Sequence, residues 1–543
     1  MKKGTELLIV IPAFKERVVF QDDLVKNLAG RSLLERAIDR AKSVETLSQR
    51  VVLFTDSEEV SLIGERNNVP SICQSFGEYS VSESVKNVLS SVPNAGKEIT
   101  SILVLSPYAP LITKVELRNA FEKFVSLGVD VLKSVRHEKQ HLFKEISQTI
   151  DELLLDTQGQ KVVLNSQAFT FFKYELLARD RSDTTYIAPW VIPENMVEIE
   201  TLQDWWVSEK LLQRKRIVFR VIGNKEVGMG HIYRSLSIAH ELHDHETLFV
   251  CDSESYEVVN ELAGYDYWLD VAPQKAMTER IASLKPDLVI NDMLDTTAEY
   301  IRALKRTGIA VVNFEDLGPG ATLADLTINE LYDKPAFPGS RILWGHDYFF
   351  VREEFDKATP HQILKKNVER ILLTFGGTDQ HNLTREIYQA IKELCRAYGV
   401  HIHIVTGPGY QGYEALAEEV KKNEGASITH ATGVISSIME RTQLAITSNG
   451  RTVYELAHMN IPSIVIPQNA RECTHSFARE ETGFIPVSPY QAGVSEDQIC
   501  VALEKLLNES NYRNKLIRNM EPYSFRANKK RVLDEILRLI KVV

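Results

Sequence analysis

The chain has 543 residues, a length that predicts three or four domains at about 150 residues each. Its 63 Lys and Arg against 74 Asp and Glu leave a net charge of −11, which argues against an extended surface for nucleic acid or for an anionic membrane. Hydrophobic residues at 44% and charged residues at 25% are ordinary globular values, so they exclude a wholly disordered chain.

The amino terminus and the cysteines indicate where the protein works. Two lysines precede the short apolar run LLIVIP, but no small-residue cleavage site follows, so the run predicts a first buried strand and not a signal peptide. No apolar stretch approaches the roughly 20 residues that a membrane-spanning helix needs. The five cysteines include no CxxC pair, which excludes a zinc ribbon or a disulfide scaffold and suits a reducing compartment. We therefore expect a soluble protein of the cytoplasm.

Short β-branched runs alternate with amphipathic, helix-like stretches along nearly the whole chain. Continuous apolar strands separated by helices predict an α/β fold with parallel sheets covered on both faces. In such sheets ligands bind beyond the carboxyl ends of the strands. The predicted strands lie at residues 7–12, 50–55, 101–106, 129–135, 216–222, 247–251, 287–292, 309–314, 370–375, 401–406, 444–448 and 462–467.

Two boundaries divide the chain. A helical pattern at 198–216 ends in a basic cluster, after which a new strand begins. A polar, proline-containing stretch at 348–367 precedes another new strand. The predicted domains are therefore 1–214, 215–358 and 359–543.

The first domain carries LLIVIPA, LAGRSLLERAIDRAKS, VVLFTDSEEV, SILVLSPYAPL and VEIETLQDWWVSEKLL in this order. With these segments it resembles the cytidylyltransferases that activate sialic and related nonulosonic acids as CMP-sugars. The resemblance implies a Rossmann-like nucleotidyltransferase domain that takes CTP and a nonulosonic acid, uses Mg²⁺ and forms a homodimer.

Two segments of this domain depart from that family. The family's triphosphate loop contains arginine, paired glycines and lysines, whereas residues 14–27 here contain no glycine and place Asp22 and Asp23 where positive charge would be wanted. The family's Mg²⁺-binding aspartates correspond to Glu198 and Glu200, whose longer side chains displace an ion that tolerates displacement poorly. Two alternatives stay open: a cytidylyltransferase with Mg²⁺ at these glutamates, or a scaffold or regulatory domain.

The segment GNKEVGMGHIYRSLSIAHEL (223–242) follows a predicted strand directly. Gly228 and Gly230 allow a tight turn and a close approach to a ligand, and the following helix start favours a phosphate. His231 at that helix start is a candidate general base. The alternative is a glycine-rich turn whose histidine only caps the helix.

Two further strand-to-helix turns lie downstream. LLTFGGTDQHNLT (372–384) places Gly376 and Gly377 after a strand. The second turn, TSNGRTVYELAHMNIP (447–462), ends a strand in polar residues and continues into a helix. On that helix Glu455 is a candidate for binding both hydroxyls of a ribose, and the alternative is a solvated helix residue. The polar candidates of this turn, besides Glu455, are Ser448, Asn449 and Thr452.

Residues from about 216 to 543 resemble the nucleotide-sugar hydrolases of pseudaminic acid biosynthesis, which are relatives of glycosyltransferases with the two-domain B-type fold. The matching elements are GMGHIYRSLSIAHEL, VINDM, NFEDLGPGATLADLTINELY, LLTFGGTDQHNLT and SNGRTVYELAHMNIPSIVIP. The resemblance implies hydrolysis of a UDP-2,4-diacetamido-2,4,6-trideoxyhexose, with His231 as the base and Arg234 completing the motif, and needs no cofactor. It also implies a set of UDP-binding residues: Gly376, Gly377, Ser448, Thr452 and Glu455.

One departure affects the chemistry. The family usually reads RADG at the first strand end, where this chain has Ile222 in place of the acidic residue. Asp292, Glu315 and Asp316 are candidates for the missing carboxylate. We interpret the chain as a fusion enzyme of nonulosonic acid biosynthesis, which combines UDP-sugar hydrolysis with a domain of the CMP-sugar synthetase kind and serves cell-surface or flagellar glycans. A glycosyltransferase that uses a UDP-sugar, and a non-catalytic nucleotide-sugar-binding scaffold, remain as alternatives.

Overall fold

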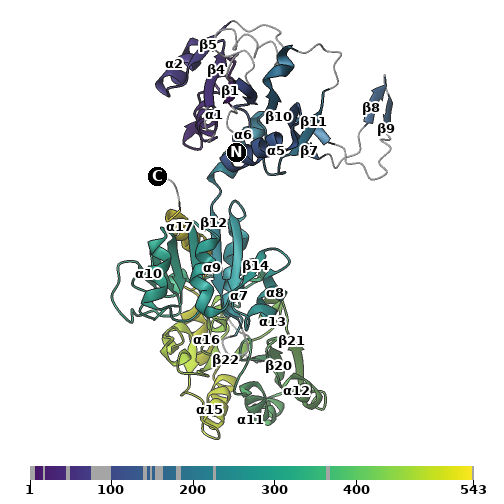
Figure 1. Cartoon of the computed structure of the whole chain (residues 1–543). Coiled ribbons are helices and arrows are strands. Elements are labelled where there is room, and N and C mark those ends of the chain that lie inside the picture. Colours follow the sequence, from purple (N-terminus) through teal and green to yellow (C-terminus); the bar gives the residue numbers. More distant parts are fainter. Residues whose placement is uncertain are drawn as a thin grey trace. The chain divides into compact units, whose positions relative to one another are not determined.

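The protein, described by a computed structural model, contains two compact units, Met1–Arg214 and Lys215–Val543 (Figure 1). Among the described helices, none combines the length and the apolar content that a membrane crossing requires. The described residues are 6–15, 19–44, 49–74, 99–137, 143–146, 149–152, 163–178, 185–223, 228–362 and 367–540.

The amino-terminal unit is built on a seven-stranded mixed sheet. β10 runs antiparallel to both of its neighbours, β6 and β7, and the other pairings are parallel, so the predicted all-parallel sheet is corrected at this strand. In spatial order the strands are β11 (Ile187–Val191), β7 (Val131–His137), β10 (Val163–Lys173), β6 (Ile99–Leu105), β1 (Glu6–Pro12), β4 (Gln49–Thr55) and β5 (Ser71–Cys73). Two hairpins stand apart from it, β2 (Asn27–Leu28) with β3 (Arg31–Ser32), and β8 (Phe143–Ile146) with β9 (Thr149–Glu152).

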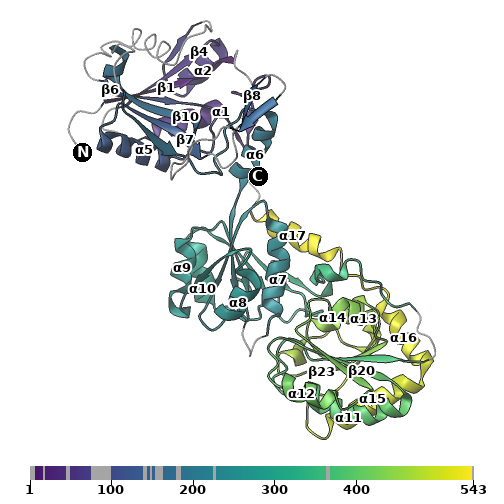
Figure 2. The same cartoon turned by 90° about the vertical axis from the view of Figure 1, so that its right-hand side faces the viewer.

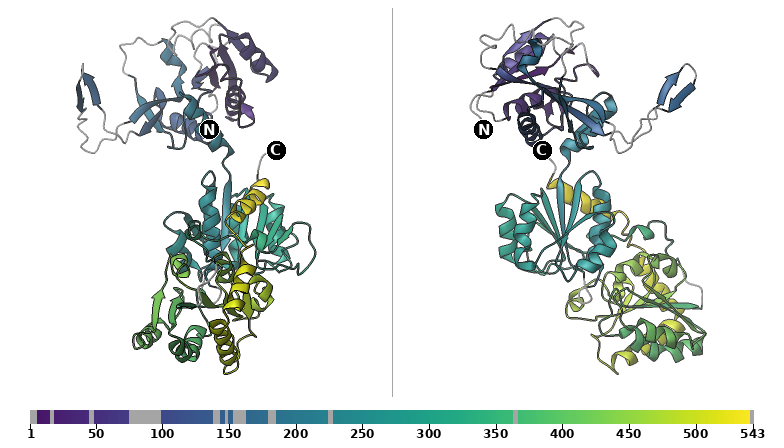
Figure 3. Two further views of the ribbon diagram at one scale, coloured as in Figure 1. Left: turned by 180° about the vertical axis from the view of Figure 1, so that it is seen from behind. Right: turned by 45° about the vertical axis from the view of Figure 1, so that its right-hand side comes forward.

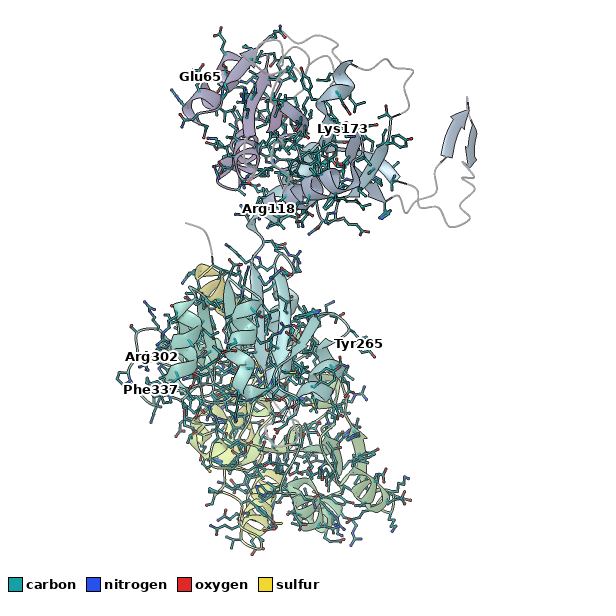
Figure 4. The ribbon with its side chains drawn as sticks, in the orientation of Figure 1. Glu65, Arg118, Lys173, Tyr265, Arg302 and Phe337 are labelled. Atoms are coloured by element: carbon teal, nitrogen blue, oxygen red, sulfur yellow. The ribbon has the colours of Figure 1, made fainter. Side chains whose placement is uncertain are left out.

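Local sequence fixes the helices of this unit at their first turns. Ser32, Thr113 and Thr201 each begin a helix as half of a capping box, which satisfies backbone N–H groups that would otherwise lack partners. Lys173, labelled in Figure 4 at the end of β10, donates to Asp130 Oδ1 at 3.2 Å and so fixes that strand to the start of β7. The helices are α1 (Leu33–Lys42), α2 (Glu58–Arg66), α5 (Lys114–Leu127) and α6 (Leu202–Gln213).

The carboxyl-terminal unit has two lobes, each with a parallel sheet. The first lobe has its strands in the order β14-β13-β12-β15-β16-β17-β18, so the order reverses between β12 and β15. Its helices cover both faces of the sheet, with α7 and α8 on one side and α9 and α10 on the other (Figure 2). Its strands are β12 (Arg216–Val221), β13 (Glu246–Cys251), β14 (Trp268–Val271), β15 (Leu288–Asp292), β16 (Ala310–Phe314), β17 (Leu326–Asn329) and β18 (Ile342–Trp344). Its helices are α7 (Gly230–Ala239), α8 (Tyr256–Ala263), α9 (Met277–Ser283) and α10 (Ala298–Arg306).

The second lobe is again a sheet covered by helices (Figure 3). Its strand order is β21-β20-β19-β22-β23-β24, which reverses between β19 and β22. The predicted α/β fold, with a two-lobed module of the B-type glycosyltransferase kind, is therefore confirmed. The strands are β19 (Arg370–Thr374), β20 (His401–Thr406), β21 (Ala426–His430), β22 (Leu444–Ser448), β23 (Ser463–Ile466) and β24 (Phe484–Pro486). The helices are α11 (Leu383–Tyr398), α12 (Tyr413–Val420), α13 (Ile435–Met439), α14 (Thr452–His458), α15 (Ser495–Asn508) and α16 (Ser510–Met520).

The last helix, α17 (Asn528–Arg538), returns from the second lobe to pack on the first. Its Val532 and Ile536 are fully buried in the core that contains β12. The lobes also share a core of their own, in which the rings of Phe349 and Tyr454 stack with centroids 4.2 Å apart. These contacts hold the two sheets in one unit with their carboxyl ends toward a common cleft.

Candidate functional site

A cleft of about 1030 Å³ lies between the two lobes. It is lined by residues that follow β12 and β15 in the first lobe and β19 and β22 in the second, the points where the strand orders reverse. Crevices at such points are where open α/β sheets bind ligands. The structure brings most of the predicted residues of this unit to the cleft, whereas Asn449, Asp292 and Asp316 do not line it. Those that line it are Gly228, Gly230, His231, Arg234, Gly376, Gly377, Ser448, Thr452 and Glu455.

His231 is the second residue of α7 and is paired with a buried carboxylate. Its Nδ1 lies 2.8 Å from Oδ1 of Asp292, the last residue of β15. Asp292 is fully buried and also accepts from the Ser235 hydroxyl at 3.0 Å. An ionised carboxylate requires the proton on Nδ1, so Nε2 is the ring nitrogen left to accept a proton in the cleft.

Arg234, one helical turn after His231, holds three carboxylates together. Its Nε donates to Asp292 Oδ2 at 2.9 Å, its Nη2 to Glu315 Oε2 at 3.2 Å, and its Nη1 to Glu330 Oε1 at 2.8 Å. Asp292 closes β15, while Glu315 and Glu330 directly follow β16 and β17. Three successive parallel strands therefore deliver their acidic ends to one buried arginine.

These charges stabilise one another against burial. Burial alone would raise the pKa of Asp292 and of Glu315, but the Arg234 guanidinium outweighs it and holds both pKa values below their usual range. Burial likewise disfavours the charge on Arg234, yet Asp292 and Glu315 raise its pKa above the usual value. Asp292, Glu315 and Arg234 are thus all charged at neutral pH.

Of the three carboxylates considered as substitutes for the family's acidic residue, two lie at the site. Asp292 contacts His231, and Glu315 lines the cleft with a φ of +51°, a strained conformation for a residue with a side chain. Asp316 instead accepts from Thr296 and Asn313 within the first lobe. Ile222 follows β12 and is not among the residues that line the cleft.

The glycines after β19 form a tight loop in the second lobe. Gly376 has a φ of +74°, which favours glycine. Gly377 packs against Gly407, and a Cβ added to Gly407 would overlap the carbonyl oxygen of Gly377. Both glycines therefore leave backbone exposed to the cleft at the switch point. Their proposed role in nucleotide binding stays a prediction.

The polar residues after β22 divide into two groups. Ser448, Thr452 and Glu455 line the cleft, and Glu455 accepts from Arg352 Nε at 3.2 Å. Asn449 is instead structural, since its amide donates to the carbonyls of Glu472 and His475 at 2.8 and 3.1 Å and so holds the loop after β23.

Sequence reasoning did not single out several charged residues of the cleft. Arg451 lies within the segment SNGRTVYEL, beside predicted residues, and Glu330 follows a strand, so both had a local signal. Burial raises the pKa of Glu472 and lowers that of His475. The cleft-lining residues missed are Arg352, Arg451, Arg471, Glu472 and His475, and the fully buried Glu330, which pairs with Arg451, was missed as well.

In the amino-terminal unit, Glu198 is surrounded by donors from the protein. Its Oε1 accepts from Arg136 Nη2 at 3.3 Å and from the Ser166 hydroxyl at 2.5 Å, and its Oε2 accepts from the Gln167 N–H at 2.9 Å. Glu200 is exposed, and no cluster of three metal-ligating side chains occurs in the described part of the chain. A Mg²⁺ ion needs free carboxylate oxygens and repels a guanidinium, so Glu198 with Arg136 does not fit one.

Charged side chains of the candidate triphosphate loop in this unit likewise already have partners within the protein. Lys15 pairs with Asp22 at 3.1 Å and with Glu59. Asp23 is fully buried and accepts from the Val19 N–H at 2.6 Å and from the Tyr108 hydroxyl at 3.1 Å. Residues 16–18 of the loop lie outside the described residues.

No family model matches the chain. Three curated proteins are similar to it at low identity. Protein MJ1062 of Methanocaldococcus jannaschii, described as uncharacterized, is 27% identical over 279 residues, covering 48% of this chain and 57% of the relative. The spore coat polysaccharide biosynthesis protein SpsG of Bacillus subtilis is 26% identical over 259 residues, covering 45% of this chain and 75% of the relative.

The third is the UDP-2,4-diacetamido-2,4,6-trideoxy-beta-L-altropyranose hydrolase of Campylobacter jejuni, 25% identical over 182 residues, covering 32% of this chain and 64% of the relative. For two of the three relatives, the chain spans less than two thirds of their length. The chain therefore has distant homologues among sugar-biosynthesis proteins, including a UDP-sugar hydrolase.

Two solved structures resemble parts of the chain at low identity. Acinetobacter baumannii MurG has a TM-score of 0.43 and 14% identity, covering 60% of this chain and 99% of that one. CMP:2-keto-3-deoxy-manno-octonic acid synthetase in complex with CTP has a TM-score of 0.30 and 11% identity, covering 38% and 98%. The fold assignment rests on the sheet topology and not on these low scores.

Proposed function

We propose that the carboxyl-terminal unit hydrolyses a UDP-2,4-diacetamido-2,4,6-trideoxyhexose to UDP and free sugar, as a step toward a nonulosonic acid. The observation that carries this proposal is the pairing of His231 with the buried Asp292 in a cleft between two Rossmann-like lobes. The name of the distant Campylobacter relative supports the substrate class.

In this proposal His231 is the base, and Asp292 orients it. Nε2 of His231 takes a proton from water while the water oxygen bonds to the anomeric carbon. The bond between that carbon and the phosphate oxygen breaks, and UDP leaves with the electron pair. Asp292 keeps the ring oriented through Nδ1 and stabilises the imidazolium that forms.

The nucleotide half of the substrate belongs in the second lobe. Gly376 and Gly377 expose backbone where a diphosphate can approach, and Ser448 and Thr452 offer hydroxyl donors. Glu455 is positioned to accept from the ribose hydroxyls while Arg352 holds its carboxylate in place. The cleft volume of about 1030 Å³ is ample for a nucleotide sugar.

Release of UDP from a panel of such nucleotide sugars in ¹⁸O-water tests the proposal. We expect the label in the free sugar, and a loss of about 10²–10⁴-fold in rate for His231→Ala. His243→Ala is the matched control, because that side chain is 80% exposed on the same lobe and should leave the rate unchanged. UDP binding without release would contradict hydrolysis, and sugar joined to an added alcohol would indicate a glycosyltransferase instead.

The hydrolysis requires residues of the carboxyl-terminal unit only. Glu198 and Glu200 give no support to Mg²⁺-dependent cytidylyl transfer, because Arg136, Ser166 and Gln167 occupy the oxygens of Glu198. We therefore assign no catalytic step to the amino-terminal unit.

A further inference from the structure

One buried carboxylate oxygen joins the two lobes of the carboxyl-terminal unit. Glu330 follows β17 in the first lobe and is fully buried. Its Oε1 accepts from Arg234 Nη1 at 2.8 Å, and the same oxygen pairs with Nη1 of Arg451, which immediately precedes α14 in the second lobe. A single acceptor is therefore shared by two guanidiniums from different lobes.

The shared oxygen stands at one end of a chain of contacts that reaches the proposed base. Arg234 donates through Nε to Asp292 at 2.9 Å, and Asp292 lies 2.8 Å from His231 Nδ1. Arg451 is thus linked to His231 through Glu330, Arg234 and Asp292. A change in how strongly Arg451 holds Glu330 alters the charge that Arg234 experiences.

Arg451 is the least compensated of the guanidiniums that line the cleft. Among the described residues, Arg234 has three carboxylate partners, Arg352 has two, and Arg471 has one of its own together with a backbone carbonyl. Arg451 has a single carboxylate partner, Glu330, which it shares with Arg234, together with the Phe350 carbonyl at 3.5 Å from its Nη2 and the ring of Phe349. Burial and the nearby Arg234 lower the pKa of Arg451 to about 10, because both disfavour its positive charge. A bound anion would stabilise that charge.

The position of Arg451 suits an anion carried by a nucleotide. It lines the cleft next to Ser448 and Thr452, and its side chain is 21% exposed. Its Cδ lies 3.2 Å from where a Cβ on Gly230 would be, so the glycine before His231 makes room for this arginine to cross between the lobes. A guanidinium matches the geometry of a phosphate through paired hydrogen bonds.

We propose that Arg451 binds the diphosphate of the nucleotide and loosens its pairing with Glu330 when it does so. Glu330 then serves Arg234 alone and fixes the position of the guanidinium that orients Asp292 and, through it, His231. Glu330 is thus a positioning residue that couples nucleotide occupancy in the second lobe to the base in the first. The inference rests on the proposed function in that a UDP-sugar is taken to occupy the cleft.

Binding of UDP and of uridine to the full-length chain, measured by calorimetry, tests this without any turnover. We expect Arg451→Gln to weaken UDP by about 10–100-fold and uridine by less than about threefold, because the lost contact is a charged one to phosphate. We expect Glu330→Gln to tighten UDP by about 3–10-fold, since it removes the competitor for Arg451. In the Arg451→Gln background, Glu330→Gln should no longer tighten UDP.

Turnover supplies a second readout that a merely structural role would not reproduce. Glu330→Gln should lower kcat for UDP release by about tenfold or more while UDP binds more tightly. Arg451→Lys, which keeps the charge, should retain part of the UDP affinity if the glutamine variant fails to fold. Arg396→Gln is the matched control, since that side chain is 76% exposed on the second lobe and should leave UDP binding unchanged.

Two results would overturn the inference. One is a UDP affinity that is unchanged or weaker in Glu330→Gln, and the other is an equal loss of UDP and uridine binding in Arg451→Gln. Failure of the proposed function is a separate outcome, namely UDP binding by the wild type with no release of UDP from any nucleotide sugar. The binding results decide the role of Arg451 in that case as well.

Discussion

The carboxylates of the two units differ in how completely the protein itself surrounds them with donors. In the amino-terminal unit, both oxygens of Glu198 accept from neighbouring protein groups, and so do both oxygens of Asp23. In the cleft, by contrast, one oxygen of Glu315 and one of Glu330 have no hydrogen-bond partner within the described part of the chain. An unpaired buried oxygen is unfavourable and is kept where function needs it. Glu315 and Glu330 thus differ from Glu198 and Asp23 in keeping one oxygen that no described protein group occupies, whereas Asp292 has protein partners on both of its oxygens.

The largest effect should come from Asp292→Asn. Asparagine cannot stabilise the imidazolium and does not enforce a proton on Nδ1 of His231, so we expect UDP release to fall by about 10²–10⁴-fold. The affinity for UDP should change by less than about threefold, because the second lobe is untouched. Rates and calorimetry on the same samples measure both.

A fold control accompanies that variant, because removing one partner of a buried ion pair costs about 3–5 kcal/mol. Thermal unfolding shows whether enough folded protein remains. Asp347→Asn, with a side chain 70% exposed on the first lobe, should behave as wild type. Nearly normal UDP release in a folded Asp292→Asn protein would rule out the proposed pairing of base and carboxylate.

Glu455→Gln sharpens the comparison within the cleft. We expect UDP to bind about tenfold more weakly, which is about 1.4 kcal/mol, because a neutral amide accepts less well from two ribose hydroxyls. Calorimetry with 2′,3′-dideoxy-UDP isolates this contact, since that ligand should bind both proteins equally. Equal losses for both ligands would place the effect on Arg352, the partner of Glu455, and not on the ribose.

Local sequence predicted the strands well because buried parallel strands read as continuous apolar runs. All twelve predicted strands are strands in the structure, but further strands were missed, among them β10, whose first half, VLNSQ, contains three polar residues. His231 was singled out from its turn alone. Glu330 and Arg451 stand beside sequence signals, but their pairing joins positions 121 residues apart and no local pattern records it. Glu198 was singled out, but its pairing with Arg136, 62 residues away, was not, for the same reason.

Glu198→Ala tests the amino-terminal half of the comparison. It leaves the Ser166 hydroxyl and the Gln167 N–H without their acceptor and Arg136 with the Met196 carbonyl, so we expect the unit to lose about 2–3 kcal/mol of stability. Methionine oxidation along a urea series reports this locally, since buried Met196 lies in the amino-terminal unit and buried Met439 in the other. Only the Met196 transition should move.

Magnesium and a neighbouring glutamate provide the controls for that variant. Glu200→Ala should change stability by less than about 0.5 kcal/mol, because its side chain is exposed. Millimolar Mg²⁺ should shift neither transition in the wild type or in either variant. A stabilisation of the Met196 transition by Mg²⁺ that disappears in both glutamate variants would show that the pair does bind the ion.

The smallest effect should come from Asp23→Asn, and it should depend on pH. Burial raises the pKa of Asp23 in the folded state above the unfolded value. The folded state therefore holds this proton more tightly, and the wild type loses stability as the pH rises from about 4 through the folded pKa. Asparagine keeps one acceptor for the Val19 N–H or the Tyr108 hydroxyl but carries no charge. The free energy of unfolding reported by Met196 should thus be higher for Asp23→Asn, relative to wild type, at pH 7 than at pH 4, with a net change within about 1 kcal/mol.

The carboxylates at the cleft depend on pH with the opposite sign. Asp292 and Glu315 have lowered pKa values, so they stabilise the fold above about pH 4 and lose that contribution as the pH falls further. We expect the stability reported by Met439 to fall below pH 4 and to be unchanged by Asp23→Asn. One titration would then separate the two kinds of carboxylate.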